Sequence, residues 1–208
     1  MQFGTLGDRV PVILMDDVYV RPREIREAAL QLSYHKPEFP YPGRIARVEQ
    51  SNSSLSHLMR WALNLVNKEY LSRVPRILHE GADLTALNKI YTDFAIVDAH
   101  PDELSNAQRI PHIDAVPVFG LIYLNPEPRG GTLFFQQTAE VDEGAHHEGY
   151  MTSTNSAFQV IGRIEAVFNR LAIYPGFILH SGDITGDWIK GDERFLEPRL
   201  TQRLVLQP

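Results

Sequence analysis

The chain has 208 residues, enough for one domain with a sizeable core, and its 43% hydrophobic and 22% charged residues are ordinary for a soluble globular protein. Its net charge of −6 disfavours nucleic acid or an anionic membrane as a partner. With no cysteines, disulfides, thiol catalysis and cysteine-based metal sites are excluded, so any metal must be held by His, Asp or Glu. There is no signal-like or membrane-spanning apolar run, and we expect a cytoplasmic protein.

The first part of the chain predicts two helices. Arg21-Pro22 precedes apolar residues at helical spacing, which predicts a helix over 22–32. Three prolines over 35–43 then indicate a loop. A second amphipathic helix should begin at Ser53 or Ser54, a suitable N-cap. Its apolar stripe consists of Leu55, Met59, Ala62, Val66 and Tyr70.

After Pro75 the chain consists mainly of short apolar segments separated by Gly, Pro and Asn, which predict strands. These segments are 90–97, 116–124, 132–135, 171–174, 177–179 and 200–206. A late helix is predicted over 155–168 from the spacing of its apolar residues. The order indicates an α+β fold, mainly β, with an antiparallel barrel or sandwich. We expect a single domain over 1–208, with a helical support region over about 1–85 and a β-barrel core over about 86–208.

The strongest local signal for chemistry is Pro-His-Ile-Asp at residues 111–114. Residues two apart in a strand point to the same face about 7 Å apart, so His112 and Asp114 can converge on one ion while Ile113 points into the opposite layer. Taken alone, the same pattern also describes a strand end with two solvated polar residues. The motifs that follow it decide between these interpretations.

Those motifs come in a recognisable order. A buried strand ends at Leu124-Asn125, and Gly130-Gly131-Thr132 opens the next strand. A Pro175-Gly176 turn precedes His180, and Arg199-Leu200-Thr201 opens the C-terminal strand. In this order the sequence resembles the iron(II)/2-oxoglutarate-dependent oxygenase superfamily, especially its prolyl-4-hydroxylase-like branch, over about 88–206. It departs from the family pattern in lacking a residue between Gly131 and Thr132, and in a longer gap after His180, which makes 183–198 an inserted loop.

The resemblance implies a double-stranded β-helix, a jelly-roll barrel flanked by the N-terminal helices. It implies an Fe(II) ion held by His112, Asp114 and His180, the facial triad of non-haem iron oxygenases, which leaves coordination positions open. The co-substrates would be 2-oxoglutarate and O2, and the products succinate, CO2 and a hydroxylated substrate. Halogenating relatives lack the carboxylate at the position of Asp114, so its presence favours hydroxylation.

The resemblance also indicates a site for the far carboxylate of 2-oxoglutarate. A guanidinium suits this group because it binds both oxygens, and Arg199 matches the family's Arg-x-Ser/Thr pattern, with Thr201 as a second donor. Arg203 shares the same strand face and is the competing assignment. Tyr91 and Tyr123 are each a candidate donor to the co-substrate and equally a candidate barrel-filling residue.

The substrate is open at this stage: an amino acid, a peptidyl side chain or another small molecule. One rival interpretation is a cupin-like metal protein that does not use 2-oxoglutarate, although cupins cluster their ligands more closely. The other rival is a barrel without catalysis that serves as an interaction module. His146-His147 lies in a polar stretch over 140–156, which we interpret as a surface loop and candidate substrate lid rather than a second metal site.

Overall fold

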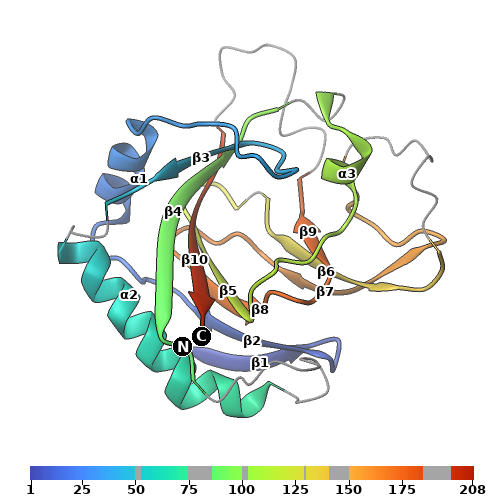
Figure 1. The fold of residues 1–208 in the computed structure, drawn as a ribbon, viewed down its shortest axis with the longest axis horizontal. Helices are drawn as coiled ribbons and strands as arrows, with labels where there is room; N and C mark the ends of the chain where they lie inside the picture. Colours follow the sequence, from blue (N-terminus) through green and yellow to red (C-terminus); the bar gives the residue numbers. More distant parts are fainter. Residues whose placement is uncertain (50–52, 75–85, 100–102, 129, 141–149, 185–197) are drawn as a thin grey trace.

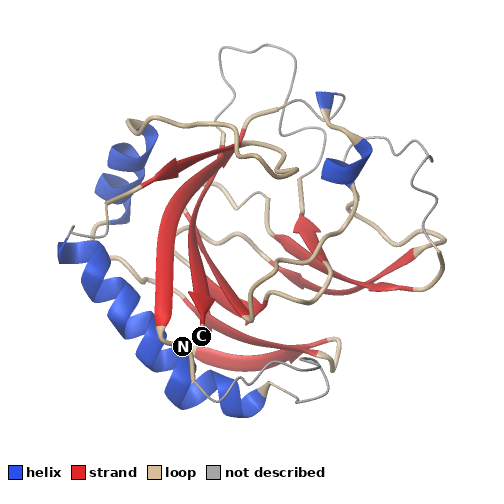
Figure 2. Cartoon of the chain, viewed as in Figure 1, coloured by secondary structure: helices blue, strands red, loops and turns tan. Residues whose placement is uncertain are grey.

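The computed structural model describes residues 1–49, 53–74, 86–99, 103–128, 130–140, 150–184 and 198–208. Within these ranges the strands form two sheets whose pairings are all antiparallel (Figures 1 and 2). The larger sheet has the order β1 (Gln2–Leu6), β2 (Val10–Met15), β8 (Leu171–Pro175), β5 (Val118–Tyr123), β10 (Arg199–Gln207), β4 (Lys89–Val97) and β3 (Arg44–Arg47). The smaller sheet has the order β7 (Phe158–Ile164), β6 (Thr132–Gln137) and β9 (His180–Gly182).

Two helices cover the outer face of the larger sheet: α1 (Pro22–Leu30) and α2 (Ser53–Leu65) (Figure 1). The predicted second helix continues beyond α2 as a π-helical turn η1 (Val66–Tyr70) and a 3-10 turn η2 (Leu71–Arg73). At the end of η1, the buried Tyr70 hydroxyl donates to the Pro11 carbonyl at 2.7 Å, which ties this helix to β2. A short helix, α3 (Asn106–Arg109), precedes the His-x-Asp motif.

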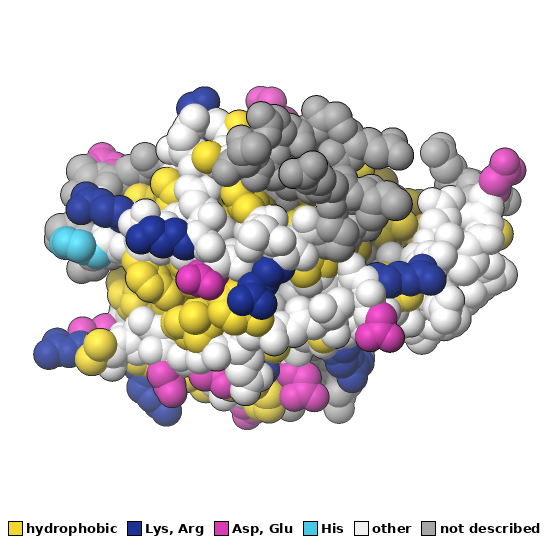
Figure 3. All heavy atoms as spheres, turned by 90° about the horizontal axis from the view of Figure 1, so that it is seen from below, with side chains coloured by type: hydrophobic (Ala, Val, Ile, Leu, Met, Phe, Trp, Pro, Cys, Tyr) yellow, Lys and Arg dark blue, Asp and Glu magenta, His cyan; other side chains and the backbone are white. Residues whose placement is uncertain are grey.

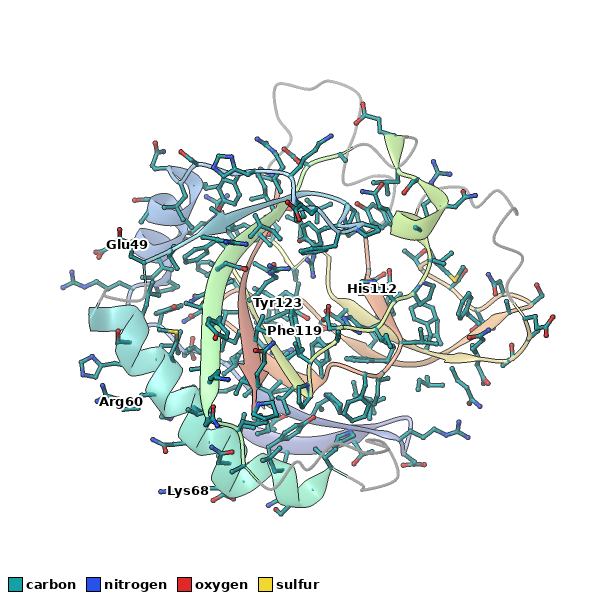
Figure 4. All side chains as sticks on the ribbon, in the orientation of Figure 1. Glu49, Arg60, Lys68, His112, Phe119 and Tyr123 are labelled. Atoms are coloured by element: carbon teal, nitrogen blue, oxygen red, sulfur yellow. The ribbon has the colours of Figure 1, made fainter. Side chains whose placement is uncertain are left out.

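The larger sheet has two buried faces, and the period-2 alternation of its strands assigns side chains to each. On β5, Val118 and Ile122 pack with the helices, whereas Phe119, Leu121 and Tyr123 pack in the barrel against residues of the smaller sheet. Figure 4 shows Phe119 and Tyr123 inside the barrel and, by contrast, Arg60 and Lys68 pointing outward from the helical layer. The odd-numbered residues at the start of β10 likewise border the cavity inside the barrel.

Two predicted elements are wrong. The segment predicted as a helix over 155–168 contains β7, because its β-branched residues suit a strand and Gly162 disfavours a helix; the strand pairs with β6 along most of its length. The pairing shifts by a bulge between Phe134 and Phe135, and this irregularity obscures the period-2 pattern. The segment 177–179 is a turn and loop rather than a strand, and β9 begins at His180.

The predicted helical support region also contributes to the large sheet, through β1, β2 and β3. Gly7 and Asp8 join β1 and β2 with φ values of +54° and +56°, the pair of positive angles that a tight hairpin turn requires. No helix in the described ranges has the length and apolarity needed to cross a membrane. Most of 140–156 and 183–198, with His146 and His147, lies outside the described residues.

Candidate metal centre

The His112–Asp114 segment runs between α3 and β5 and is held by backbone hydrogen bonds rather than as part of a strand. His112 exchanges two of these bonds with His180, at 2.9 and 2.8 Å, and the Asp114 amide donates to the Gly176 carbonyl at 2.8 Å. The two hydrogen bonds between His112 and His180 place these two expected metal ligands directly opposite each other. Ile113 does not enter the opposite layer as expected but is 56% exposed.

The structure brings His112, Asp114 and His180 together. One potential ligand atom from each residue lies within 4.8 Å of the other two. His180 Nε2 lies 3.2 Å from Asp114 Oδ2, and the centroids of the two imidazole rings lie 4.7 Å apart. Among the described residues this is the group of three His, Asp or Glu side chains with the geometry to hold a metal ion.

The hydrogen bonding of His180 fits a metal ligand. Its Nδ1 lies 2.7 Å from the Ile178 carbonyl oxygen, and because a carbonyl only accepts, Nδ1 must carry a proton. In the neutral ring Nε2 then has a lone pair directed at the Asp114 carboxylate, which also offers only lone pairs. Two acceptors at 3.2 Å need a cation between them, either a proton or a metal ion. A backbone carbonyl on the other ring nitrogen is the usual support of a metal-binding histidine.

The electrostatics of the site favour the metal-binding forms of the other two residues. Desolvation and, to a smaller extent, nearby His180 together lower the pKa of His112 to about 4, against the opposing effect of Asp114. The neutral imidazole, the form that binds a metal ion, is therefore favoured at His112. Desolvation alone would raise the pKa of Asp114, but the hydrogen bond with His180 and nearby positive charges outweigh it and hold that pKa below its ordinary value.

A cavity of about 480 Å³ opens beside the three residues, between the two sheets. Its floor includes residues that are almost fully buried: Thr132, Tyr174, His180, Arg199 and Thr201. Its rim includes Phe39 and Ile113, which are 53% and 56% exposed. Figure 4 shows His112 on the segment that crosses in front of the smaller sheet, facing the barrel interior.

The two candidate arginines differ in their partners. Arg203 makes a two-point ion pair with Asp93, with both contacts at 2.6 Å. Arg199 is buried and, among the described residues, donates to two backbone carbonyls, from Nε to Gly130 at 2.6 Å and from one terminal nitrogen to Gly131 at 3.3 Å. Within the described part of the chain no carboxylate forms an ion pair with Arg199. Its charge borders the cavity, and the described carboxylate that attracts it, Asp183, is itself ion-paired with Arg163 at 2.8 Å.

Gly131 is needed for this arrangement. A Cβ atom at this position would lie 2.1 Å from the Ile164 carbonyl oxygen on β7, so no other residue fits without moving the backbone. The close approach brings the Gly131 carbonyl within reach of Arg199 and places Thr132 at the start of β6.

The candidate tyrosines occupy different positions. Tyr91 does not line the cavity; it is 45% exposed and pairs with Val205 near the far end of β10, so the structure does not support it as a co-substrate residue. Tyr123 lies behind the cavity, where its hydroxyl is 2.7 Å from Thr132 Oγ1 and its ring centroid is 5.8 Å from the Arg199 guanidinium carbon.

Sequence reasoning missed Tyr174. Its buried hydroxyl borders the cavity and, like Thr201 Oγ1, has no hydrogen-bond partner among the described residues. Burial raises the pKa of Tyr174 well above its ordinary value, so the hydroxyl keeps its proton and can donate. The alternation of β8 could have identified it, because Ala172 and Tyr174 share the face that packs inside the barrel.

The fold matches that of known oxygenases. A prolyl hydroxylase from Trichoplax adhaerens, solved with a hypoxia inducible factor peptide, aligns with a TM-score of 0.54 at 12% identity, covering 94% of this chain and 83% of that one. A prolyl-4-hydroxylase from Pseudomonas putida aligns with a TM-score of 0.50 at 12% identity, covering 94% and 91%. HygX from Streptomyces hygroscopicus, solved with nickel, 2-oxoglutarate and hygromycin B, gives 0.52 at 14%, covering 97% and 84%.

These likenesses confirm the expected fold, a double-stranded β-helix of the prolyl-4-hydroxylase-like type with flanking helices. No curated protein sequence matches the chain. A protein-family model, described as a family of unknown function (DUF6445), matches residues 1–144 and 136–204. Because these matches cover most of the sequence, the chain belongs to the DUF6445 family.

Proposed function

We propose that this protein is a non-haem Fe(II)- and 2-oxoglutarate-dependent oxygenase that hydroxylates its substrate and releases succinate and CO2. The observation that carries the proposal is the contact of His180 Nε2 with Asp114 Oδ2 at 3.2 Å, beside His112 and at the wall of a cavity. Two imidazoles and one carboxylate are the donor set of the facial triad, and they occupy one side of an ion, leaving positions open for other ligands.

Each triad residue has a distinct task. His180 is oriented by its bond to the Ile178 carbonyl, which presents Nε2 to the ion. His112 is fixed relative to His180 by their paired backbone hydrogen bonds. Asp114 offsets part of the positive charge of the metal. With O2 and the co-substrate, a bound Fe(II) ion would supply the oxidation that this chain cannot perform with its own side chains.

The floor of the same cavity suits the far carboxylate of 2-oxoglutarate. Arg199 offers a guanidinium without a described carboxylate partner, and Thr201 and Tyr174 offer buried hydroxyls without described partners. Tyr123 supports the floor indirectly, because its hydroxyl holds Thr132 and its ring lies beside Arg199. A carboxylate would thus neutralise the Arg199 charge and give partners to two buried hydroxyls that are costly to leave unpaired. The HygX structure, solved with nickel and 2-oxoglutarate bound, gives a precedent on this fold.

The substrate would be a small molecule or a peptidyl side chain that enters from the rim of the cavity. The described part of the face seen in Figure 3 carries acidic and basic side chains interspersed with hydrophobic ones, with no continuous basic patch of the kind that binds nucleic acid.

The test is an anaerobic titration of the purified protein with Fe(II) and then 2-oxoglutarate, followed by visible absorption. We expect a charge-transfer band that appears only when both are present, and that His112→Ala and Asp114→Ala abolish. Two control variants should retain the band. One is His35→Ala, which removes a histidine remote from the triad in sequence, and the other is Tyr91→Phe.

The competing cupin-like function predicts a different result. If Fe(II) binds with the wild-type triad but 2-oxoglutarate leaves the spectrum and the iron affinity unchanged, the co-substrate assignment is wrong and a metal protein of another kind is indicated. If Fe(II) binds equally well to the wild type and to Asp114→Ala, the metal assignment is wrong as well.

A further inference from the structure

The outer part of the cavity differs in character from its floor. Residues 39–42, Phe-Pro-Tyr-Pro, form one side of the rim, and Ile113 lies on another. Phe39 and Ile113 are among the few large hydrophobic residues that are strongly exposed in the described ranges. A single exposed hydrophobic side chain needs no explanation, but several around one cavity mark a surface that a ligand covers.

This rim is held in place by hydrogen bonds rather than left free. The Gln108 side chain donates from Nε2 to the Tyr41 carbonyl at 2.7 Å and accepts from the Ser105 amide at 2.9 Å. One glutamine thus ties the 39–42 segment to the start of α3. The Tyr41 ring also lies over Arg203, with the guanidinium carbon 5.5 Å from its centroid. The apolar wall is therefore formed before any ligand arrives, as is usual for small-molecule sites.

Few charges are left for a substrate. On the proposed function, Asp114 binds the metal and Arg199 binds the co-substrate carboxylate. Arg203 also borders the cavity, but its charge is offset by the two contacts with Asp93. A charged substrate would lose its hydration in this cavity without gaining a described partner of opposite charge, which is unfavourable.

One polar group on the cavity wall remains unassigned. Tyr150 is 7% exposed and borders the cavity, and its hydroxyl is buried without a hydrogen-bond partner among the described residues. Burial raises its pKa above the ordinary value, so the hydroxyl keeps its proton. It can therefore give or receive one hydrogen bond with a neutral group of a ligand.

The cavity suits a compact molecule better than an extended peptide. A peptide bound as an added strand needs a free sheet edge, and β9, the strand nearest the triad, has none at His180. That strand pairs with β6 on one side and with His112 on the other.

Resting on the proposed function, we infer that the substrate is a small, uncharged, largely apolar molecule. Its apolar body packs between Phe39 and Ile113, and one neutral polar group bonds to the Tyr150 hydroxyl. Tyr150 is then a specificity-determining residue, and Gln108 is a positioning residue for the wall that the apolar body contacts.

The test measures binding by ligand-observed NMR to the anaerobic Fe(II) protein with saturating 2-oxoglutarate, so that Arg199 is occupied. The probes are 2-naphthol, naphthalene and 2-naphthoate. We expect 2-naphthol to bind at least about tenfold more tightly than 2-naphthoate. Tyr150→Phe should weaken 2-naphthol about fivefold, the effect of one lost hydrogen bond, and leave naphthalene unchanged. Phe39→Ser should weaken both neutral probes.

Val20→Ser is the matched control, because Val20 is 97% exposed and does not line this cavity, and it should change nothing. Tighter binding of 2-naphthoate, equal effects of Tyr150→Phe on naphthol and naphthalene, or no binding of any probe would overturn the inference. The charge-transfer band recorded on the same samples separates the two proposals. A sample with the band but the wrong probe preference contradicts the substrate class alone, whereas absence of the band contradicts the oxygenase assignment.

Discussion

Replacing Arg199 with alanine should remove the anchor of the 2-oxoglutarate carboxylate. Charge-assisted hydrogen bonds contribute about 1.5–3 kcal/mol, and an unpaired carboxylate at a buried site adds a further desolvation cost. Since Arg199 is only 6% exposed, both effects apply, and we expect a loss of about 2–4 kcal/mol. The 2-oxoglutarate dissociation constant should therefore rise roughly 30- to 700-fold. The assay is a titration of the charge-transfer band.

Arg203→Ala is the matched comparison. It should leave the dissociation constant within about threefold of wild type. It should instead lower the free energy of unfolding by about 1–3 kcal/mol, because it leaves the partly buried Asp93 carboxylate without its ion-pair partner. Thermal stabilisation by Fe(II) alone should be intact in both variants, which checks that the triad still forms. If Arg199→Ala keeps wild-type affinity, or Arg203→Ala loses more, the assignment of the anchor is refuted.

Two further predictions concern stability. Gly131→Ala should lower the free energy of unfolding, measured by denaturant titration, by about 3 kcal/mol, because the added Cβ would lie 2.1 Å from the Ile164 carbonyl oxygen. Gly4→Ala is the control: its Cβ would lie 3.9 Å from the nearest atom, and the free energy of unfolding should change by less than about 0.5 kcal/mol. The hydrogen bond from Arg170 lowers the pKa of Asp16 from 3.8, so this pair stabilises the fold above pH 3.8 and the contribution is lost as the pH falls through the folded pKa. Asp16→Asn should therefore cost about 0.5 kcal/mol at pH 7, and this cost should shrink as the pH falls below 3.8 and vanish below the folded pKa; a cost that does not change with pH would contradict this origin.

The strands that carry the barrel could be predicted because their residues alternate between two buried faces. Segments such as 118–123 and 199–207 are apolar enough, and sufficiently bounded by Gly, Pro or Asn, to identify from local pattern alone. The failure at β7 has a different cause. Phe158, Ile161 and Ile164 lie three apart, which suits a helix, but a bulge in the pairing with β6 produces the same spacing in a strand. The position of the bulge depends on the pairing with β6, so it cannot be inferred from the sequence of β7 alone.

Part of the candidate site could likewise be predicted from the sequence, and part of it could not. Strand spacing predicted that His112 and Asp114 could converge, the resemblance to the oxygenase superfamily added His180, and the structure brings the three together. The choice between Arg199 and Arg203 could not be made from strand periodicity, because both share a face; the distinguishing feature is Asp93 on the neighbouring strand β4. For the same reason, nothing local to Tyr91 indicated that it lies beyond the cavity, since strand periodicity gives a face but not a distance along it.

The Asp114→Asn variant tests the triad from the side of stability. In the metal-free protein the Asp114 carboxylate and His180 Nε2 both present lone pairs at 3.2 Å, an arrangement that a proton must satisfy. An asparagine can turn its amide toward Nε2 and donate a hydrogen bond directly. We therefore expect metal-free Asp114→Asn to be at least as stable as wild type at pH 8, by thermal unfolding.

The same change should have the opposite effect when Fe(II) is present. A ligand at 100 times its dissociation constant stabilises the fold by about 2.7 kcal/mol, which for a chain of this size corresponds to a rise in Tm of roughly 5–10 °C. A neutral amide oxygen binds the ion less well than a carboxylate, so most of that rise should disappear in the variant. Loss of stability in the metal-free variant, or an undiminished rise with Fe(II), would show that the carboxylate is there to support the fold. Undiminished stability of the metal-free variant, together with a smaller rise in Tm with Fe(II), would show instead that Asp114 serves to bind the metal. The carboxylate would then lower the stability of the metal-free fold, as is common where a functional site conflicts with the best packing.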